Sequence, residues 1–232
     1  MTALLASVRN LAEAELVVAG GADWLDLKEP AAGALGAVAP SEILRVVRRF
    51  RGCLPISATI GDCWDTPVLI APRVRELVAL QVDYVKVGLF ANAWCAELAA
   101  ALEAACAMMP RMIAVCFAEA LPAQTDIKRL AELGFCGVML DTANKTSGSL
   151  LTEITHSAIA EFLAAAKSHQ LLTGLAGSLT AADIPALLPH APDYLGFRGA
   201  LCRRGDRVEA LEASAVTDIR KLIPPAPRRA AI

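Results

Sequence analysis

The sequence has no excess of charge of either sign. Its 22 Lys and Arg residues stand against 24 Asp and Glu, which gives a formal net charge of −2 at pH 7. A protein that binds nucleic acid through the phosphate backbone needs surplus positive charge to neutralise it. We therefore expect no nucleic acid among the partners of this chain.

The sequence also has no apolar run long enough for a membrane span. The most apolar helical stretch, residues 91–109, carries Glu97 and Glu103, and carboxylates are costly at the middle of a bilayer. The N-terminus reaches Arg9 after too few apolar residues for a signal-peptide core, and it has no basic leader. We expect a cytoplasmic protein that does not act at a membrane.

Patterns typical of metal sites are missing as well. The seven cysteines include no C-x-x-C pair, so reduced and buried thiols are expected. The histidines, His156, His169 and His190, have no ligand spacing, and the sequence predicts no metal.

What the sequence does have is eight short apolar runs typical of buried parallel strands. Helical patterns with apolar residues three and four apart lie between them, as at Leu98, Ala101 and Leu102. Each strand-plus-helix unit takes about 29 of the 232 residues, and no Pro-, Gly- or Ser-rich linker marks a boundary. The runs are Leu4 to Val8, Trp24 to Lys28, Ile56 to Thr59, Tyr84 to Gly88, Met112 to Phe117, Gly137 to Asp141, Leu171 to Ala176 and Tyr194 to Phe197.

This alternation predicts the α/β class and a single (β/α)₈ TIM barrel as the catalytic domain, over residues 1–223. An open, doubly wound sheet is the alternative, because strand counts from one sequence are error-prone. The prolines of residues 224–232 cannot continue a helix, so a flexible C-terminal tail is expected there. The oligomeric state stays open; a homo-oligomer formed through the outer helices is one option.

Charged residues lie within or just after three of the predicted strands. In a TIM barrel the C-terminal ends of the strands form the face that carries the active site. In W-L-D-L-K, Asp26 and Lys28 are two residues apart and so face the same way. Lys86 lies between valines in Y-V-K-V-G, Asp141 ends the sixth run, and Lys145 follows four residues later. The pattern predicts that all five side chains converge on one barrel mouth.

Two interpretations of these charges stay open. In one, they are ion pairs that plug the barrel end, or the register is displaced by one residue and they face the helices. In the other, repulsion between clustered ammonium groups and partial desolvation lower the pKa of one lysine. The resulting neutral amine can attack an aldehyde or ketone to form a Schiff base.

Glycine-containing segments follow the seventh and eighth runs, as G-L-A-G-S-L-T and G-F-R-G-A-L-C. In barrels that bind phosphate, these two loops hold it through backbone N–H groups. Gly177, Ser178, Arg198 and Gly199 are the candidates, although either loop alone could be an ordinary turn.

Several other polar residues follow predicted strands and are candidates to line the same mouth. Ser7 and Arg9, at the end of the first run, are candidates to touch substrate. Thr59, after the third run, is a candidate of the same kind, and Asp62 and Glu119 lie in the loops after the third and fifth runs.

Five segments resemble the (5-formylfuran-3-yl)methyl phosphate synthase family, also called 4-(hydroxymethyl)-2-furancarboxaldehyde-phosphate synthase. That family works in the biosynthesis of methanofuran, and related carriers serve bacteria that oxidise one-carbon compounds. The resemblance runs from the first predicted strand to the eighth. The segments are S-V-R-N at 7–10, G-G-A-D-W-L-D-L-K-E-P at 20–30, G-A-L-G-A at 33–37, V-K-V-G-L at 85–89 and L-D-T-A-N-K at 140–145.

The resemblance implies a TIM-barrel lyase that condenses two molecules of glyceraldehyde 3-phosphate into a phosphorylated furan aldehyde, with loss of phosphate and water. It implies that Lys28 is the Schiff-base residue and that Asp26, Lys86, Asp141 and Lys145 are the other acidic and basic positions of the site. It implies no metal and no organic cofactor. The expected partner is a small phosphorylated aldehyde.

Two other functions remain compatible with the residues themselves. One is a different class I aldolase or a phosphosugar epimerase on a phosphate-binding barrel. The other is a subunit that binds a phosphorylated metabolite without catalysis. A furan product would form only under the first interpretation, so product analysis separates the three.

Overall fold

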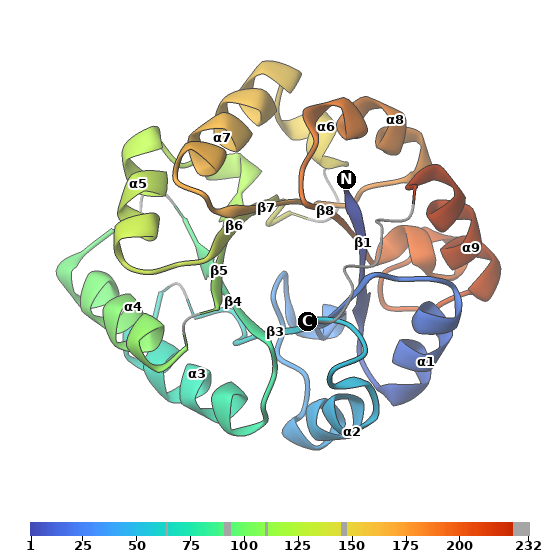
Figure 1. The fold of residues 1–232 in the computed structure, drawn as a ribbon, viewed down its shortest axis with the longest axis horizontal. Helices are drawn as coiled ribbons and strands as arrows, with labels where there is room; N and C mark the ends of the chain where they lie inside the picture. The colour runs from blue at the N-terminus through green and yellow to red at the C-terminus, as the bar shows by residue number, and fades with distance from the viewer. Residues whose placement is uncertain (64, 91–93, 110, 145–147, 225–232) are drawn as a thin grey trace.

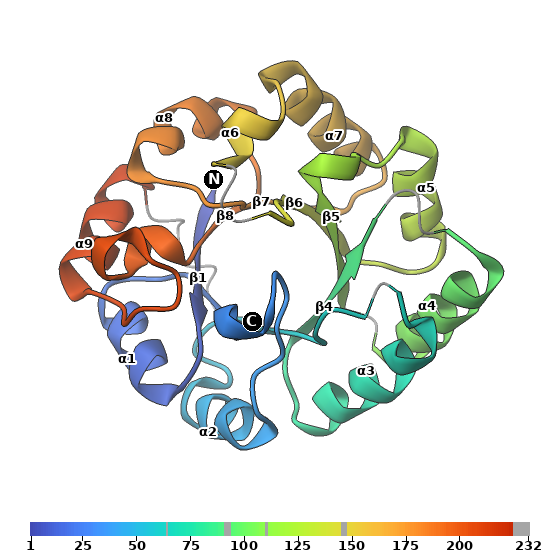
Figure 2. The same cartoon turned by 180° about the vertical axis from the view of Figure 1, so that it is seen from behind.

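A computed structural model describes residues 1–63, 65–90, 94–109, 111–144 and 148–224. Eight parallel strands form a closed barrel in chain order, and helices surround it (Figures 1 and 2). Closure comes from parallel pairing of the first strand with the last, where Ala3 lies opposite Tyr194 and Ala6 opposite Phe197. The predicted TIM barrel is confirmed, and the open sheet is excluded.

The strand ends agree with the predicted runs to within one residue. Lys28 and Ala176 lie just beyond their strands rather than in them. The strands are β1 (Ala3–Val8), β2 (Trp24–Leu27), β3 (Ile56–Thr59), β4 (Tyr84–Leu89), β5 (Met112–Phe117), β6 (Gly137–Asp141), β7 (Leu172–Leu175) and β8 (Tyr194–Phe197). The α-helices are α1 (Leu11–Ala19), α2 (Pro40–Phe50), α3 (Ile70–Ala79), α4 (Ala96–Met108), α5 (Gln124–Glu132), α6 (Leu150–Glu153), α7 (His156–Ser168), α8 (Ile184–Leu187) and α9 (Ala213–Leu222). None of these helices, in the part of the chain just described, has the length and apolar character that crossing a membrane requires.

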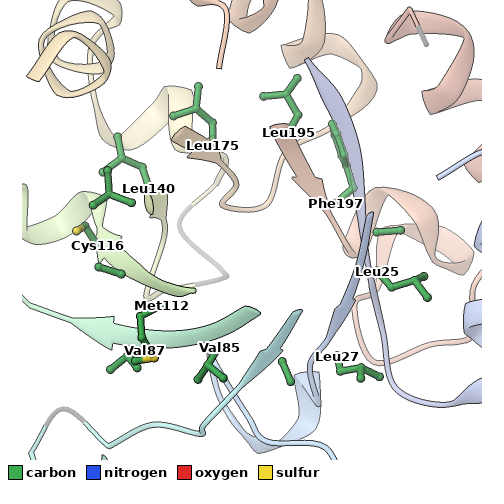
Figure 3. Packing of buried hydrophobic residues seen from close by; sticks show 14 of the residues in the cluster. Leu25, Leu27, Val85, Val87, Met112, Cys116, Leu140, Leu175, Leu195 and Phe197 are labelled. Atoms are coloured by element: carbon green, nitrogen blue, oxygen red, sulfur yellow. The ribbon is translucent and has the colours of Figure 1, made fainter. Parts of the chain in front are cut away.

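The two-residue period of the strands divides their side chains between two environments. Leu25 and Leu27 of β2, and Val85 and Val87 of β4, belong to the apolar layer between strands and helices (Figure 3). The residues between them therefore face the barrel interior. This alternation places polar groups inside a barrel whose strands are buried on both faces.

Aromatic side chains fill the N-terminal half of the interior. Trp24 packs against Tyr84 and Tyr194, with ring centroids 4.6 and 5.1 Å apart. Gly174 makes room for this layer, because a Cβ there would lie 2.2 Å from Cε2 of Tyr194. A ligand must therefore enter from the other end of the barrel, where the strands finish.

The loop between β2 and α2 reaches over part of that open end (Figure 2). Leu35 joins the apolar cluster inside the barrel and is only 2% exposed. Asp62 accepts a hydrogen bond from Leu35 N at 3.0 Å, and Thr59 Oγ1 donates to Gly36 O at 2.9 Å. The loop is thus tied to the end of β3, and it leaves the mouth open on the side of β1 and β6–β8.

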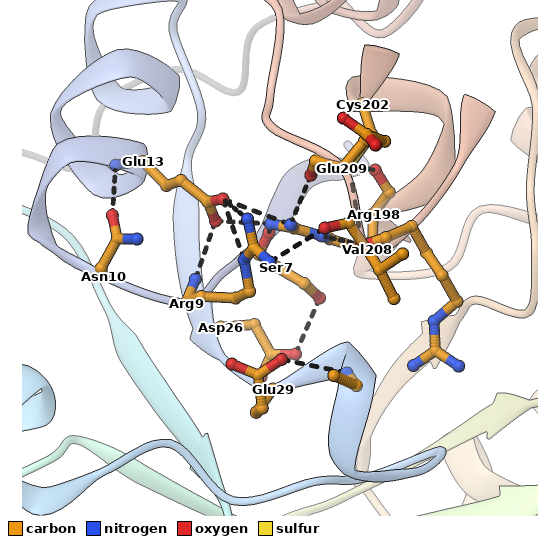
Figure 4. Close-up of polar contacts among 12 residues, drawn as sticks. Ser7, Arg9, Asn10, Glu13, Asp26, Glu29, Arg198, Cys202, Val208 and Glu209 are labelled. Carbon is orange, nitrogen blue, oxygen red and sulfur yellow. Dashed lines mark hydrogen bonds and ion pairs between the residues drawn. The ribbon is translucent and has the colours of Figure 1, made fainter. Parts of the chain in front are cut away.

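A charged cluster joins the β1–α1 turn to the loop after β8 (Figure 4). Asn10 caps α1, accepting from Glu13 N at 3.0 Å. The Glu13 carboxylate accepts from Arg9 N at 2.9 Å and pairs with the Arg198 guanidinium at 2.5 Å. Burial alone would raise the pKa of Glu13, but the hydrogen bonds from Arg198 and Arg9 outweigh burial and hold it below its usual value.

We predict that Glu13→Gln lowers the free energy of unfolding at pH 7 by on the order of 2 kcal/mol, because it leaves a buried guanidinium without its counter-charge. The folded pKa of Glu13 lies below its ordinary value of 4.5, so its stabilising contribution is present above that pH and is lost as the pH falls through the folded pKa. The difference between the two proteins should therefore shrink in acid. Urea unfolding at pH 7 and near pH 4 measures it.

Glu15→Gln is the matched control for this prediction. Glu15 lies on the same helix, has a side chain that is 52% exposed and contacts Arg49 at 3.6 Å. Exposed pairs contribute little, so this variant should unfold like the wild type. A destabilisation by Glu13→Gln that is equally large at both pH values would contradict the assignment to the carboxylate charge.

Candidate active site

A cavity of about 490 Å³ opens at the C-terminal ends of the strands. Its walls come from the ends of β1, β2, β6, β7 and β8 and from the loops after β7 and β8. The strand ends supply charged groups, and the loops supply glycines and an arginine. Most of the residues selected from the sequence line this cavity: Ser7, Asp26, Lys28, Asp141, Gly177, Ser178, Arg198 and Gly199.

Lys28 and Asp141 face each other across the cavity. They follow β2 and end β6, which lie opposite each other in the closed ring of eight strands. Lys28 Nζ is 3.6 Å from Asp141 Oδ2, longer than the 2.7–2.9 Å typical of a charge-assisted hydrogen bond. The Lys28 side chain is 10% exposed. The amine is therefore loosely paired and open to the cavity.

A second pair lies deeper in the barrel. Lys86 Nζ is 2.8 Å from Asp26 Oδ1, and both side chains are almost fully buried. Asp26 also accepts from Ser57 Oγ at 2.6 Å. It accepts from Ser7 Oγ at 3.0 Å as well (Figure 4). The register that pairs Asp26 with Ser57 and Ser7 on the neighbouring strands brings these hydroxyls to the carboxylate.

The protonation of this deeper pair follows from its burial and its neighbours. Burial lowers the pKa of Lys86, and although Asp26 opposes this, the Lys28 charge adds to the lowering. Burial alone would raise the pKa of Asp26, but Lys86 and Lys28 hold it below its ordinary value. Asp26 is therefore a stable carboxylate between two amines.

The loop after β7 adopts backbone conformations that most side chains avoid. Gly177 has φ +106°, and a Cβ there would lie 3.0 Å from Thr142 N. Ser178 has φ +48°, which is uncommon for a residue other than glycine. Such conformations concentrate at ligand-binding loops. Gly199 faces the same cavity at the start of a short 3₁₀ turn, Gly199–Leu201.

Arg198 lines the cavity, but its guanidinium is fully engaged by the protein. Nε donates to Arg207 O at 2.8 Å, and Nη1 donates to Ser7 O at 3.3 Å and to Glu13. Nη2 donates to Glu13 at 3.2 Å and to Glu209 O at 3.1 Å. These contacts use all five N–H groups, so the guanidinium braces the loop after β8 rather than offering donors to a ligand.

Arg9 lies away from the cavity that contains Lys28. Its guanidinium bonds to Glu13, and Nη1 donates to Val208 O at 2.9 Å. Together with the start of α1, Glu29 of the loop after β2 and Glu42 of α2, it lines a separate shallow pocket. The structure therefore does not bring Arg9 together with the other predicted site residues.

Lys145 lies outside the described residues. The segment before it is fixed by Glu119, whose carboxylate accepts from Ala143 N at 3.0 Å and Asn144 N at 2.8 Å. Glu119, selected as a possible lining residue, thus holds the loop after β6. Asp62 and Thr59 have the same kind of role, since they hold the loop after β2.

Sequence reasoning missed Arg207. It lies in the loop after β8, lines the cavity and donates from Nη2 to Gly33 O at 2.9 Å. The available signal was the cluster Arg203, Arg204 and Arg207 after the eighth run, but nothing in the sequence singles out one arginine of the three.

Among the residues that the structure describes, no three His, Cys, Asp or Glu side chains lie close enough together to hold a metal ion. His156 and His190 meet outside the barrel, with Nδ1 and Nε2 3.0 Å apart. Neither ring lines the cavity.

Comparison with known proteins identifies the family. Residues 4–220 match the family described as 4-HFC-P synthase. A Methylorubrum extorquens protein, named as a candidate (5-formylfuran-3-yl)methyl phosphate synthase, is 40% identical over 225 residues, which are 97% of this chain and 93% of that protein. The (5-formylfuran-3-yl)methyl phosphate synthase of Methanopyrus kandleri is 35% identical over 218 residues, covering 88% and 91% of the two chains.

Solved structures agree on the fold. Phosphoribosyl anthranilate isomerase from Thermotoga maritima superposes with a TM-score of 0.66 at 14% identity, over 96% of this chain and 98% of that one. At this identity the likeness concerns the barrel alone. The family match and the 30–40% identical relatives go further, and they show that the chain belongs to the (5-formylfuran-3-yl)methyl phosphate synthase family of enzymes.

Proposed function

We propose that this chain is a cytoplasmic lyase that condenses two molecules of glyceraldehyde 3-phosphate into (5-formylfuran-3-yl)methyl phosphate, for a cofactor of the methanofuran type. One inorganic phosphate and two water molecules leave. Membership of the family supports the reaction class. The observation that carries the proposal is the loosely paired amine of Lys28 in the cavity, 3.6 Å from Asp141 and above the buried pair of Lys86 and Asp26.

Lys28 is the amine better placed to react. It lines the cavity, whereas Lys86 does not and is held at 2.8 Å by Asp26. Proton loss from Lys28 to the Asp141 carboxylate gives the neutral amine that attacks the carbonyl carbon of the first triose phosphate.

Loss of water from that adduct gives an iminium ion, which draws electrons from the neighbouring carbon. That carbon then loses a proton and forms a bond to the second triose. Asp141 is the carboxylate within reach of Lys28, so it is proposed as the group that accepts and returns protons. Hydrolysis of the imine releases Lys28, and ring closure with elimination of one phosphate and two water molecules gives the aromatic furan, whose stability makes the sequence effectively irreversible.

Lys86 and Asp26 are proposed to act from the cavity floor. Asp26 holds the Lys86 ammonium in a fixed position, with two serine hydroxyls holding Asp26 in turn. A fixed positive charge in a buried site stabilises negative charge that develops on the substrate oxygen. Lys145 is proposed as a further basic group because it matches the family pattern.

One substrate phosphate is proposed to bind at the edges of the two glycine loops. The backbone at Gly177, Ser178 and Gly199 borders the cavity, and backbone N–H groups at these loops of a barrel are suited to a phosphate. The Arg198 guanidinium is given no direct contact with phosphate in this proposal, since its donors hold the loop.

Mixing the purified protein with glyceraldehyde 3-phosphate should produce the ultraviolet absorption of a furan aldehyde. One inorganic phosphate should be released for each furan formed. Asp141→Asn should lower kcat roughly 10²- to 10⁴-fold, the range typical of a lost general acid–base group. Consumption of the triose without a furan would indicate another aldolase or an epimerase instead, and binding without consumption would indicate a binding subunit.

Borohydride reduction during turnover should add the mass of the reduced triose phosphate adduct to the peptide that contains Lys28. Lys28→Arg should remove this label and lower kcat roughly 10³-fold or more, because a guanidinium stays protonated and cannot form the imine. Lys128→Arg is the matched control, since Lys128 lies on α5 with a side chain 62% exposed. A label on Lys86 with none on Lys28 would refute the assignment.

A further inference from the structure

Arg207 is a cation in the cavity that the proposed mechanism does not use. Of the residues with described positions, it pairs with no carboxylate, and its guanidinium makes a single hydrogen bond, from Nη2 to Gly33 O at 2.9 Å. Arg198, in the same loop, uses all five of its N–H groups within the protein. Arg207 therefore keeps most of its donors for another group.

The surroundings of Arg207 do not supply that group. Burial lowers the pKa of Arg207, while the charges of Asp141 and Asp62 act in the opposite direction. Asp62 is committed to the loop after β2, where it accepts from Leu35 N at 3.0 Å, and Asp141 faces Lys28. A half-buried guanidinium without an anion pays a desolvation cost that a bound anion would offset.

The contact with Gly33 places Arg207 on a particular side of the mouth. Gly33 follows β2, whereas Gly177 and Ser178 follow β7. Arg207 thus links the loop after β8 to the loop after β2, whereas the glycine loop belongs to β7. The reaction needs two phosphorylated substrates, and the loops after β7 and β8 account for one phosphate.

The backbone at Gly33 is built for this contact. Gly33 has φ +111°, and a Cβ there would lie 2.0 Å from Asp62 Oδ2. Only glycine can therefore present its carbonyl to Arg207 while Asp62 holds the next turn of the loop. With Nη2 fixed in this way, less conformational freedom is lost when the rest of the guanidinium binds an anion.

We propose that Arg207 binds the phosphate of the second triose, so that the cavity holds two phosphate sites, one at the glycine loops and one at Arg207. The proposal rests on the proposed function for the identity of the substrate. The chemistry that Arg207 recognises is more general, namely a phosphomonoester, whose oxygens match the guanidinium fork. Arg207 is a binding residue here and takes no part in the proton transfers.

Calorimetric titration with sn-glycerol 3-phosphate tests this proposal, because that compound carries the phosphate but no carbonyl and cannot react with Lys28. The wild-type protein should bind two equivalents. Arg207→Gln should leave one equivalent unchanged and weaken the other roughly ten- to a hundredfold, the loss typical of a charge-assisted contact. The affinity of Arg207→Lys for the weakened equivalent should lie between those of the wild type and Arg207→Gln, because lysine keeps the charge but lacks the forked pair of donors.

Arg203→Gln is the matched control. It removes the same charge from the same loop, but Arg203 is 61% exposed and contacts Glu212 at 3.4 Å, so both equivalents should bind as in the wild type. Melting temperatures measured without ligand show whether each variant is folded. If Arg207→Gln does not fold, the Arg207→Lys titration decides the question.

A folded Arg207→Gln or Arg207→Lys protein that binds the same number of equivalents with unchanged affinity would overturn the proposal. So would an equal loss in Arg203→Gln, since it would trace the effect to general charge. Steady-state kinetics with glyceraldehyde 3-phosphate should show a raised KM and a smaller change in kcat for Arg207→Gln. If the wild type makes no furan but shows Arg207-dependent binding, the proposed function fails and the phosphate site stands.

Discussion

The ion pair between Lys28 and Asp141 depends on closure of the barrel. The two residues are more than a hundred positions apart in the sequence, and they meet because β2 and β6 stand opposite each other in a ring of eight strands. An open sheet would place the same strands side by side or further apart and would not bring their ends across a cavity. Closure also gives the cavity a floor, where Asp26 and Lys86 are buried deeply enough for each to control the charge of the other.

The sequence was sufficient for the features that follow from local periodicity. Apolar runs separated by helical patterns predicted all eight strands, because buried parallel strands are apolar throughout. The two-residue spacing of Asp26 and Lys28 predicted that they share the barrel interior, because side chains alternate along a strand. Strand order in a TIM barrel follows chain order, so even the approach of Lys28 to Asp141 was within reach of the sequence.

The roles of the arginines could not be predicted from the sequence, because the role of a guanidinium depends on which acceptors the fold places around it. Arg198 was expected to bind phosphate, but its donors are used by Glu13 on α1 and by backbone carbonyls of its own loop. Arg9 forms an ion pair with the same carboxylate and lies outside the cavity. The backbone N–H of Glu13 donates to the helix cap at Asn10, while its carboxylate decides the position of both arginines.

The stretch D-L-K-E-P, followed by G-A-L-G-A, combines a charged strand end with a loop that shapes the space around it. Leu35 fills one side of the mouth, and Gly36 is required because a Cβ there would lie 2.2 Å from Glu29 O. Gly33 offers its carbonyl to Arg207 from the same loop. The proposed reaction, which joins two phosphorylated trioses at one lysine, needs a cavity that holds both in a fixed relation, and this loop restricts the cavity beside Lys28. The glycines of the motif therefore serve the geometry of the cavity, while Lys28 and Asp26 supply its charge.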